Sequence, residues 1–287
     1  MNGPQIRAYL DLTKPRIVSM ALVTLAMGFW AASGPTTAWQ TLFFALLGAG
    51  LVASGASTLN HYIERDADAR MERTRARPIP SGSIKPASAL TFGIYLILAG
   101  LALSLWLVNL LTAFLLLLSA FLYVLVYTPM KRITVLNTPL GAIPGAIPPL
   151  AGWTAASDDL GMGGLLLFLI LFVWQHPHFF AISWMYRDDY RRAGFRMLSG
   201  ADATGATTSA WILITATILV PVSLLPSLLG VTSLAYTTGA LIAGIGLVLV
   251  CIPMWREHTH ANAVRVLKAS VYYLPVLLVC MIVDAFI

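Results

Sequence analysis

Three oxygen-bearing side chains stand four residues apart in the segment NHYIERDADARMERTRARPIPSGSIKP, which covers residues 60–86. They are Asn60, Glu64 and Asp68. Residues at this spacing lie on one face of an α-helix, each about 6 Å above the last. Two carboxylates so placed repel each other unless cations lie nearby, and Mg²⁺ beside phosphate typically takes one or two protein carboxylates. The spacing therefore predicts a Mg²⁺–phosphate site on this helix.

Arginines follow the three oxygen ligands in the same segment. Guanidinium groups are suited to bidentate phosphate contacts, and those available are Arg65, Arg70, Arg73, Arg75 and Arg77. A positive loop whose acids pair with its own arginines on a solvated face explains the composition equally well. Asn60 favours the site, because a polar amide at the end of an apolar helix is costly unless it has partners there.

A second group of acids occurs in WQHPHFFAISWMYRDDYRRAGFRML, residues 174–198. Asp188 and Asp189 follow an apolar stretch, and arginines flank them as in the first segment. Two acidic clusters that emerge on the same side of a membrane can share a metal ion and a pyrophosphate. The alternative is that these acids form only local ion pairs.

Two histidines, His176 and His178, lie several helical turns before these acids. Imidazole inside a membrane span is a functional hypothesis by default, and it can ligate iron. We expect Pro177, between them, to perturb the helix locally. The alternative is that both histidines are structural and hydrogen-bond across helices or line a polar cavity.

The elements that must position all these residues are membrane-spanning helices. Of the 287 residues, 58% are apolar and only 10% are charged, against roughly a quarter charged in a soluble domain, which excludes a soluble globular enzyme. A spanning helix needs about 20 apolar residues, and division of the charge-free stretches by this length predicts nine spans. We therefore expect an all-α polytopic membrane protein with a single domain, residues 1–287.

The fifth predicted span, residues 133–157, is unusually rich in glycine and proline. We expect its backbone to be irregular and to line the active chamber, because a membrane tolerates irregular backbone only against protein or a cavity. The residues concerned are Gly141, Pro144, Gly145, Pro148 and Pro149.

The basic residues predict the orientation of the spans. Lys and Arg near span ends collect on the cytoplasmic side, and all 18 of them fall in segments that nine spans place on one side. We therefore predict a cytoplasmic N-terminus, and we take the net charge of +6 as a sign of topology that implies no nucleic-acid partner. The basic segments are residues 7–16, 65–85, 131–132, 187–196 and 256–268.

The chain resembles a known family at these motifs. LTKPR at residues 12–16, NHYIERDADARMERTRARPIPSG after the second predicted span and the segment at 174–198 are together similar to the haem O synthases, or protohaem IX farnesyltransferases. These enzymes form a branch of the UbiA superfamily of intramembrane prenyltransferases, which have nine spans. The resemblance covers nearly the whole chain, and the histidine-containing segment is the more specific to the haem-modifying branch.

The resemblance implies that Asn60, Glu64, Asp68 and Asp189 are catalytic. The family pattern N-x-x-x-D-x-x-x-D holds farnesyl diphosphate through Mg²⁺, and Glu64 replaces its middle Asp, which keeps the carboxylate but changes its reach. A second D-x-x-x-D is absent. Asp189 is the best match to the haem branch, and Asp188 joins it as an expected ligand of metal and diphosphate.

Further roles follow from the resemblance. Lys14, Arg73, Arg77 and Lys131 are expected to contact the diphosphate. His176 or His178 is expected to bind haem, with His178 favoured because it is nearer the cytoplasmic acids.

The implied reaction begins with ionisation of farnesyl diphosphate, and a vinyl group of haem b then captures the farnesyl cation. Water addition completes haem O, so that haem b is a substrate and Mg²⁺ the cofactor. Expected partners are the lipid bilayer and a downstream haem A synthase or terminal oxidase. The expected location is the bacterial cytoplasmic membrane, with the active site toward the cytoplasm.

Two other functions fit part of the sequence. A UbiA-type enzyme that prenylates a quinone precursor or a chlorin shares Asn60, Glu64 and Asp68 but does not need histidines within a span. A haem-binding transporter or assembly scaffold needs no chemistry. Transporters commonly show inverted repeats, and none is visible in this sequence.

Overall fold

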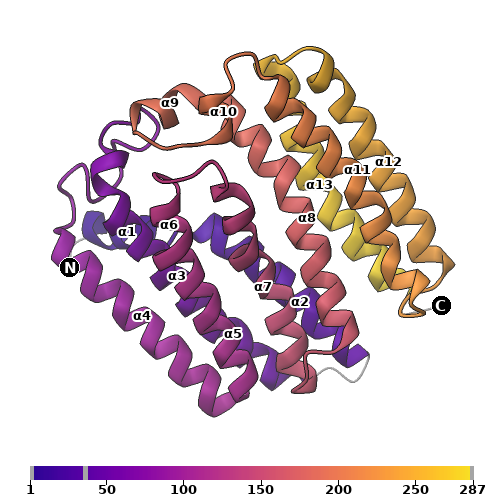
Figure 1. Ribbon diagram of the computed structural model, residues 1–287. Coiled ribbons are helices and arrows are strands. Elements are labelled where there is room, and N and C mark those ends of the chain that lie inside the picture. The colour runs from indigo at the N-terminus through magenta and orange to yellow at the C-terminus, as the bar shows by residue number, and fades with distance from the viewer. Residues whose placement is uncertain (1–2, 35–37, 285–287) are drawn as a thin grey trace.

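The structure, a computed structural model, describes residues 3–34 and 38–284, and every regular element within these ranges is helical (Figure 1). In chain order the elements are α1 (Gly3–Leu12), α2 (Pro15–Ser33), α3 (Trp39–Asp68), α4 (Pro86–Leu107), α5 (Leu110–Phe121), the π-helix η2 (Leu122–Tyr127), α6 (Thr128–Met130), α7 (Asn137–Ser157), α8 (Met162–Met185), α9 (Arg187–Arg192), α10 (Leu198–Ala201), α11 (Ala206–Leu228), α12 (Leu234–Arg256) and α13 (His260–Asp284).

Eight helices in the described ranges are long and apolar enough to cross a membrane: α2, α3, α4, the continuous run from α5 to α6, α8, α11, α12 and α13. This confirms an all-α, multi-pass membrane protein. Sequence places the helix ends well: Asn109 separates α4 from α5, and its side-chain oxygen caps α5 by accepting the Thr112 N–H at 2.8 Å. A ninth span and the cytoplasmic N-terminus stay predictions.

Helix α7 lies where the fifth span was predicted, but the expectation of an irregular backbone is wrong. It is one helix of 21 residues that continues through its prolines. Pro148 has no N–H for the Pro144 carbonyl, the partner of a regular helix. Ser119 of α5 replaces that bond, because its hydroxyl donates to the Pro144 oxygen at 3.0 Å. A neighbouring helix thus satisfies the backbone inside the bilayer.

Pro177 does not break α8, which runs from Met162 to Met185, although it leaves the Val173 carbonyl without an N–H partner in the helix. His176 and His178 therefore keep regular helical positions. They stand two residues apart, so their side chains leave α8 roughly 200° apart.

Helices α2 and α7 touch backbone to backbone. A Cβ added at Gly28 of α2 would overlap the carbonyl oxygen of Pro149, and one added at Gly152 of α7 would overlap that of Leu25. Small residues that let helix backbones approach closely are the usual means of packing in membranes. This contact joins α2 to the half of the bundle whose buried core also includes α3 and α5.

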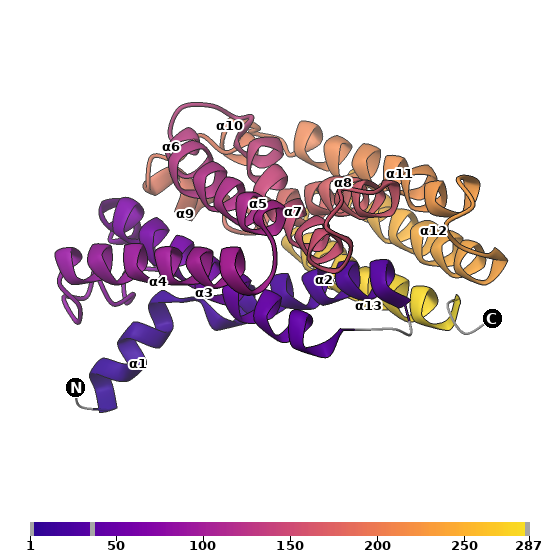
Figure 2. The same ribbon diagram turned by 90° about the horizontal axis from the view of Figure 1, so that it is seen from below.

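The loops that carry the predicted motifs gather at one end of the bundle, where Figure 1 shows α6, α9 and α10. Helix α1 projects from the bundle near the same end, as Figure 2 shows. The segment between α12 and α13 belongs to this end too, because Trp184 Nε1 at the end of α8 donates to the His258 carbonyl at 3.0 Å. The segments predicted to share one side of the membrane do lie together.

Candidate active site

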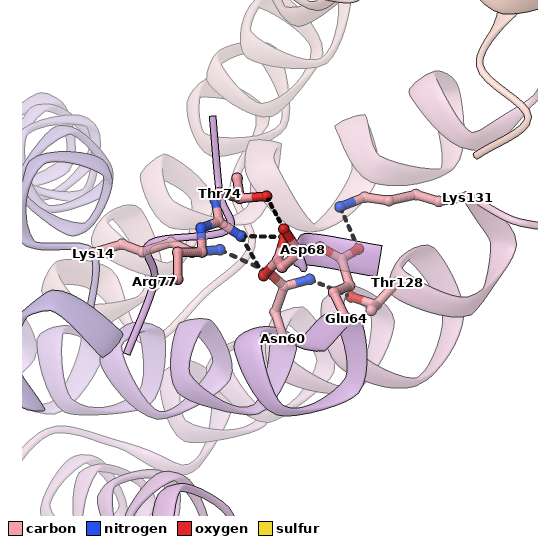
Figure 3. A network of polar contacts seen from close by, with 8 residues as sticks. All are labelled: Lys14, Asn60, Glu64, Asp68, Thr74, Arg77, Thr128 and Lys131. Atoms are coloured by element: carbon pink, nitrogen blue, oxygen red, sulfur yellow. Dashed lines mark hydrogen bonds and ion pairs between the residues drawn. The ribbon is translucent and has the colours of Figure 1, made fainter. Parts of the chain in front are cut away.

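Helix α3 carries Asn60, Glu64 and Asp68 on one face, because the helix continues to Asp68. All three are buried, with exposed fractions of 1%, 4% and 0%. Buried carboxylates need cations or hydrogen-bond donors, and in this site each of the three side chains has a different cationic partner (Figure 3). This arrangement is the centre of the candidate site.

Asn60 joins two other elements to α3. Its Oδ1 accepts a hydrogen bond from Lys14 Nζ at 2.6 Å, and its Nδ2 donates to Thr128 Oγ1 at 3.0 Å. The Thr128 hydroxyl donates in turn to the Tyr123 carbonyl of η2 at 2.8 Å. The π-helix therefore places the threonine that fixes the orientation of the Asn60 amide, and the amide oxygen faces the lysine.

Lys14 reaches this position through an unusual backbone conformation. It lies between α1 and α2 with φ 51° and ψ 59°, the left-handed region, which is uncommon for residues other than glycine. Burial, helped by the positive charge of Arg77, lowers the pKa of Lys14 to about 7, although Glu64 opposes this.

Glu64 pairs with Lys131, which follows α6. Lys131 Nζ lies 2.7 Å from Glu64 Oε1 and 4.6 Å from the centre of the Tyr127 ring. Burial alone would lower the pKa of Lys131, but the charge and hydrogen bond of Glu64, together with the nearby Tyr127 and Tyr123, outweigh burial and raise this pKa above its usual value. Lys131 is therefore charged throughout the physiological range.

Asp68 pairs with Arg77 of the loop that follows α3. Arg77 Nη1 donates to Oδ1 at 2.8 Å and to Oδ2 at 2.7 Å. Thr74 Oγ1 of the same loop donates to the Asp68 backbone carbonyl at 2.9 Å. The loop thus folds back over the end of α3, and the site contains three cations and two carboxylates, which favours an anionic ligand.

The second acidic cluster is not joined to the first. Asp188 pairs with Arg191 at 3.7 Å, and Asp189 pairs with Arg192, all within α9. No group of three or more His, Cys, Asp or Glu side chains suited to a metal ion occurs within residues 3–34 and 38–284. Metal ligation by Asp188 and Asp189 together with the α3 residues stays a prediction.

The two acidic segments do meet through apolar and aromatic contacts. Ala67 and Met71 at the end of α3 belong to one buried cluster with residues that follow α9: Ala193, Phe195 and Met197. Arg73 lies over the Tyr186 ring, 5.1 Å from its centre. These contacts hold α9 beside the site even though its carboxylates point to their own arginines.

His176 and His178 occupy different faces of α8. The His176 ring lies near the Phe172 and Phe180 rings and its Nδ1 donates to the Phe172 carbonyl at 2.7 Å. His178 stacks on Trp174, and its Nδ1 lies 2.9 Å from Ser270 Oγ of α13.

The hydrogen bonds assign the tautomer of both rings. The Ser270 hydroxyl donates to the Leu267 carbonyl at 2.8 Å, so it accepts a hydrogen bond from His178. His176 Nδ1 also carries the proton, because a carbonyl can only accept. Each Nε2 then has a free lone pair, as an iron ligand requires. His178 is the more exposed of the two.

Comparison with known proteins agrees with this architecture. The model of the UbiA prenyltransferase family matches residues 21–272. The chain belongs to this family. Among curated UbiA-type relatives, it is 41% identical over 289 residues to the Protoheme IX farnesyltransferase of Solibacter usitatus (strain Ellin6076), covering 97% of this chain and 99% of that protein. The Protoheme IX farnesyltransferase of Salinibacter ruber (strain DSM 13855 / M31) is 43% identical over 279 residues, again with 97% and 99% coverage.

Solved UbiA-type structures share the fold at much lower identity. A digeranylgeranylglyceryl phosphate synthase superposes with a TM-score of 0.80 at 18% identity and covers 98% of both chains. A UbiA homologue from Archaeoglobus fulgidus, bound to GPP and Mg²⁺, superposes with a TM-score of 0.70 at 14% identity, and the match covers 96% of this chain and 99% of that one. The helical arrangement is therefore that of the UbiA family.

The α3 donor set of this UbiA-family chain is compatible with Mg²⁺. Two carboxylates and one amide oxygen are hard ligands, and Mg²⁺ usually keeps only one or two protein carboxylates and completes its shell with water and phosphate. Lys131 contacts only one of the two Glu64 oxygens. Asn60, Glu64 and Asp68 are therefore the residues that could hold the ion.

Three side chains at this site were not predicted from the sequence: Thr74, Thr128 and His61. The sequence does not indicate the roles of the two threonines, because their contacts depend on the fold of the loop after α3 and on the π-helix. His61 follows Asn60 and stands three and seven residues before Glu64 and Asp68, which is also a one-face helical spacing. That spacing was the available signal.

Proposed function

We propose that this protein transfers the farnesyl group of farnesyl diphosphate to a vinyl group of haem b, with addition of water, to give haem O and diphosphate. The observation that carries the proposal is the set of three buried α3 oxygen ligands, each paired with a cation. It occurs in a chain similar along nearly its whole length to proteins named Protoheme IX farnesyltransferase. Neither alternative function is favoured by a specific contact.

Asn60, Glu64 and Asp68 are assigned to Mg²⁺, which would supply positive charge to the leaving diphosphate. A distant member of the family has been solved with GPP and Mg²⁺, which supports this assignment. The three side chains are already held on one buried face, so the ion meets oxygens that are in place once Lys14, Arg77 and Lys131 turn from them to the diphosphate. Such preorganised charge is usually the largest contribution to catalysis.

The cations Lys14, Arg77 and Lys131 are assigned to the diphosphate. Each holds an α3 oxygen at 2.6–2.8 Å in the structure, and each is released for an anion when that oxygen takes another partner. The reaction breaks the ester bond between farnesyl C1 and the oxygen that links it to the diphosphate, and the electron pair leaves with the diphosphate. These side chains then balance the charge that builds on the leaving group.

Asp189, Asp188 and Arg73 complete the assignment. The Asp189 side chain is only 11% exposed, whereas that of Asp188 is 66% exposed. Asp189 is therefore the stronger of the two as a ligand of metal and diphosphate. Arg73, held over Tyr186, is assigned to the outer phosphate oxygens because it belongs to the loop that carries Arg77.

His178 is assigned to the haem iron. Its Nε2 lone pair is free and its ring is partly exposed, whereas His176 is buried between phenylalanines. Ligation would fix the porphyrin against α8 and α13 so that a vinyl group meets the farnesyl cation. Apolar helices around the reaction limit water and so protect this cation from premature hydrolysis.

We further assign the protein to the bacterial cytoplasmic membrane, with the site toward the cytoplasm, because the basic segments gather at the site end of the bundle. The expected partners are the lipid bilayer and a downstream haem A synthase or terminal oxidase that uses haem O. No nucleic-acid partner is proposed.

The test is incubation of the purified protein with haem b, farnesyl diphosphate and Mg²⁺, followed by mass spectrometry of the extracted haem. The expected product is heavier than haem b by one farnesyl group and one water. Parallel reactions offer a quinone precursor or a chlorin in place of haem b. Transfer to one of these acceptors with none to haem b would overturn the proposal.

A further inference from the structure

His61 is a buried imidazole with no hydrogen-bond partner on either ring nitrogen. It is 3% exposed, and both Nδ1 and Nε2 are unpaired. Among the residues that the structure describes, only Trp153 Nε1 and the Tyr236 hydroxyl share this condition, each with a single atom. His61 is therefore the most unsatisfied buried side chain in the described part of the protein.

Such a group has a cost that packing alone does not explain. A buried donor or acceptor without a partner destabilises the folded state, whereas an apolar side chain of similar shape would not. Buried polar groups are nearly always paired, so an exception calls for a ligand or a function. A phenylalanine would fill the same space without that penalty.

The position of His61 points to the candidate site. It stands three residues before Glu64 and seven before Asp68 on α3, so it shares their face of the helix. It lies about one turn deeper in the bilayer than Glu64. Asn60, which the proposed function assigns to the same Mg²⁺–diphosphate, directly precedes His61, so a diphosphate held at Asn60, Glu64 and Asp68 reaches this depth.

Three cations act on the His61 ring. The groups that act electrostatically on the ring are Lys14, Arg77 and Lys131, which pair with Asn60, Asp68 and Glu64. Both carboxylates are engaged with those cations, and neither hydrogen-bonds the imidazole. An unpaired N–H donor among three cations fits an anionic oxygen.

We propose that His61 is a substrate-binding residue whose imidazole N–H donates a hydrogen bond to the diphosphate of the prenyl donor, on the side nearer the bilayer centre. This inference rests on the proposed function. When the C1–oxygen bond breaks, the electron pair stays on the diphosphate and the proton stays on the imidazole. The hydrogen bond strengthens as charge builds on the acceptor, so it contributes to ionisation as well as to binding.

The decisive variant is His61→Phe. Two readouts separate binding from packing: the melting temperature without ligand, and its rise on addition of Mg²⁺ with inorganic diphosphate. We expect the ligand-free melting temperature to hold or rise, and at least half of the ligand-induced rise to be lost. The KM for farnesyl diphosphate should rise about ten- to a hundredfold, as for a lost hydrogen bond to a charged group, with the KM for haem b unchanged.

Amide variants identify the nitrogen and keep the test open if the Phe variant does not fold. The amide N–H of Asn can replace Nδ1–H, and that of Gln can replace Nε2–H. We expect one of His61→Asn and His61→Gln to restore the KM for farnesyl diphosphate to within about threefold of the parent value. Tyr236→Phe is the matched control, because it removes an unpaired buried hydroxyl from α12, outside the site; it should leave both KM values unchanged.

Several outcomes overturn the inference. The first is a parental KM for farnesyl diphosphate in His61→Phe, or in both amide variants. The second is a lower melting temperature of His61→Phe with a parental response to diphosphate, and the third is a KM for farnesyl diphosphate in both amide variants as high as in His61→Phe. The last is a rise in the KM for haem b in place of that for farnesyl diphosphate. The last outcome would assign the hydrogen bond to a haem propionate. If the parent protein makes haem O and His61→Phe matches it, only this inference fails. If the parent protein makes no haem O, the proposed function fails.

Discussion

Lys131 and Glu64 form a buried ion pair that joins the end of α6 to the end of α3, with 2.7 Å between Nζ and Oε1. The lysine side chain is 13% exposed and the glutamate side chain 6%. Their residues are 67 positions apart in the chain. The pair therefore closes a long-range contact at the point where we place the diphosphate.

The first prediction concerns the stability of this pair. Lys131→Met leaves the Glu64 carboxylate without its closest cation, and the loss of one partner of a buried pair typically costs about 3–5 kcal/mol. We expect a clear fall in melting temperature in detergent. The double variant Lys131→Met with Glu64→Leu should recover most of the lost melting temperature, because neither charge remains buried. It should still be inactive in farnesyl transfer. A double variant no more stable than the single one would contradict this account.

The second prediction separates a site carboxylate from a solvated one. Asp68→Asn removes the charge that meets Arg77 and should reduce farnesyl transfer by about a hundredfold or more, the range seen when one preorganised electrostatic contact is removed. Asp66→Asn is the control, since the Asp66 side chain is 67% exposed, and we expect less than a twofold effect. Rates are measured as haem O formed per minute, and equal rates in the two variants would refute the role of Asp68.

The third prediction tests the contact between α2 and α7. Gly28→Ala should lower the melting temperature, because the new Cβ overlaps the Pro149 carbonyl. Gly246→Ala in α12 should raise it slightly, because nothing lies within 4 Å of its Cβ and alanine favours a helix over glycine by about 1 kcal/mol. The prediction is opposite signs for the same substitution, and a shift of the same sign at both positions would contradict it.

The fourth prediction concerns Asp202, which caps α11. Its carboxylate accepts the Gly205 N–H at 2.9 Å and the Thr208 N–H at 2.7 Å. Burial alone would raise the pKa of Asp202, but these hydrogen bonds outweigh burial and lower it. A lowered folded-state pKa means that the ionised cap stabilises above the unfolded-state pKa of about 3.9. That stabilisation is lost as the pH falls through the folded-state value.

Asp202→Ala should therefore cost about 1 kcal/mol at pH 7, and the difference in melting temperature from the parent should shrink on acidification below the folded-state pKa, because the protonated carboxyl keeps one acceptor oxygen but loses its charge. Asp202→Asn retains an oxygen acceptor, so its melting temperature at pH 7 should lie between those of the parent and Asp202→Ala. Melting curves between pH 7 and strongly acidic pH provide the measurement. A gap that widens as the pH falls would show that the sign is wrong.

The fifth prediction distinguishes the two histidines of α8. His178→Ala should weaken haem b binding by about tenfold or more, as for the loss of a metal contact, and should shift the Soret band of the bound haem. His176→Ala should change neither strongly, because its ring lies on the other face of α8 between Phe172 and Phe180. The reverse pattern in a haem titration would transfer the role to His176.

Much of the fold could be predicted because hydrophobicity and charge act locally along a membrane chain. The helix boundary at Asn109 and the long apolar runs are visible in sequence, since water and lipid impose them residue by residue. The regular course of α7 could not be predicted. It depends on Ser119 of α5 meeting one carbonyl that Pro148 leaves free, and this contact requires knowledge of the packing.

For the site, the sequence predicted which side chains share a helix face but not which partners they contact. The four-residue spacing placed Asn60, Glu64 and Asp68 on one helical face without knowledge of their partners. The identity of the partners depends on conformations that sequence does not specify, such as the left-handed backbone of Lys14. The composition near Asp189 resembles that of the first cluster, but ion pairs within α9 engage both of its acids.

The touching backbones of α2 and α7 define which parts of the molecule can move. Helices separated by side chains can slide or rotate against each other, but two helices whose main chains are in contact behave as one rigid unit. Lys14 immediately precedes α2, so its backbone is fixed to that unit. We therefore expect α2 and α7 to move as one body during turnover, and the segments after α3 and α6 to supply the faster motions, in the nanosecond-to-microsecond range of loops.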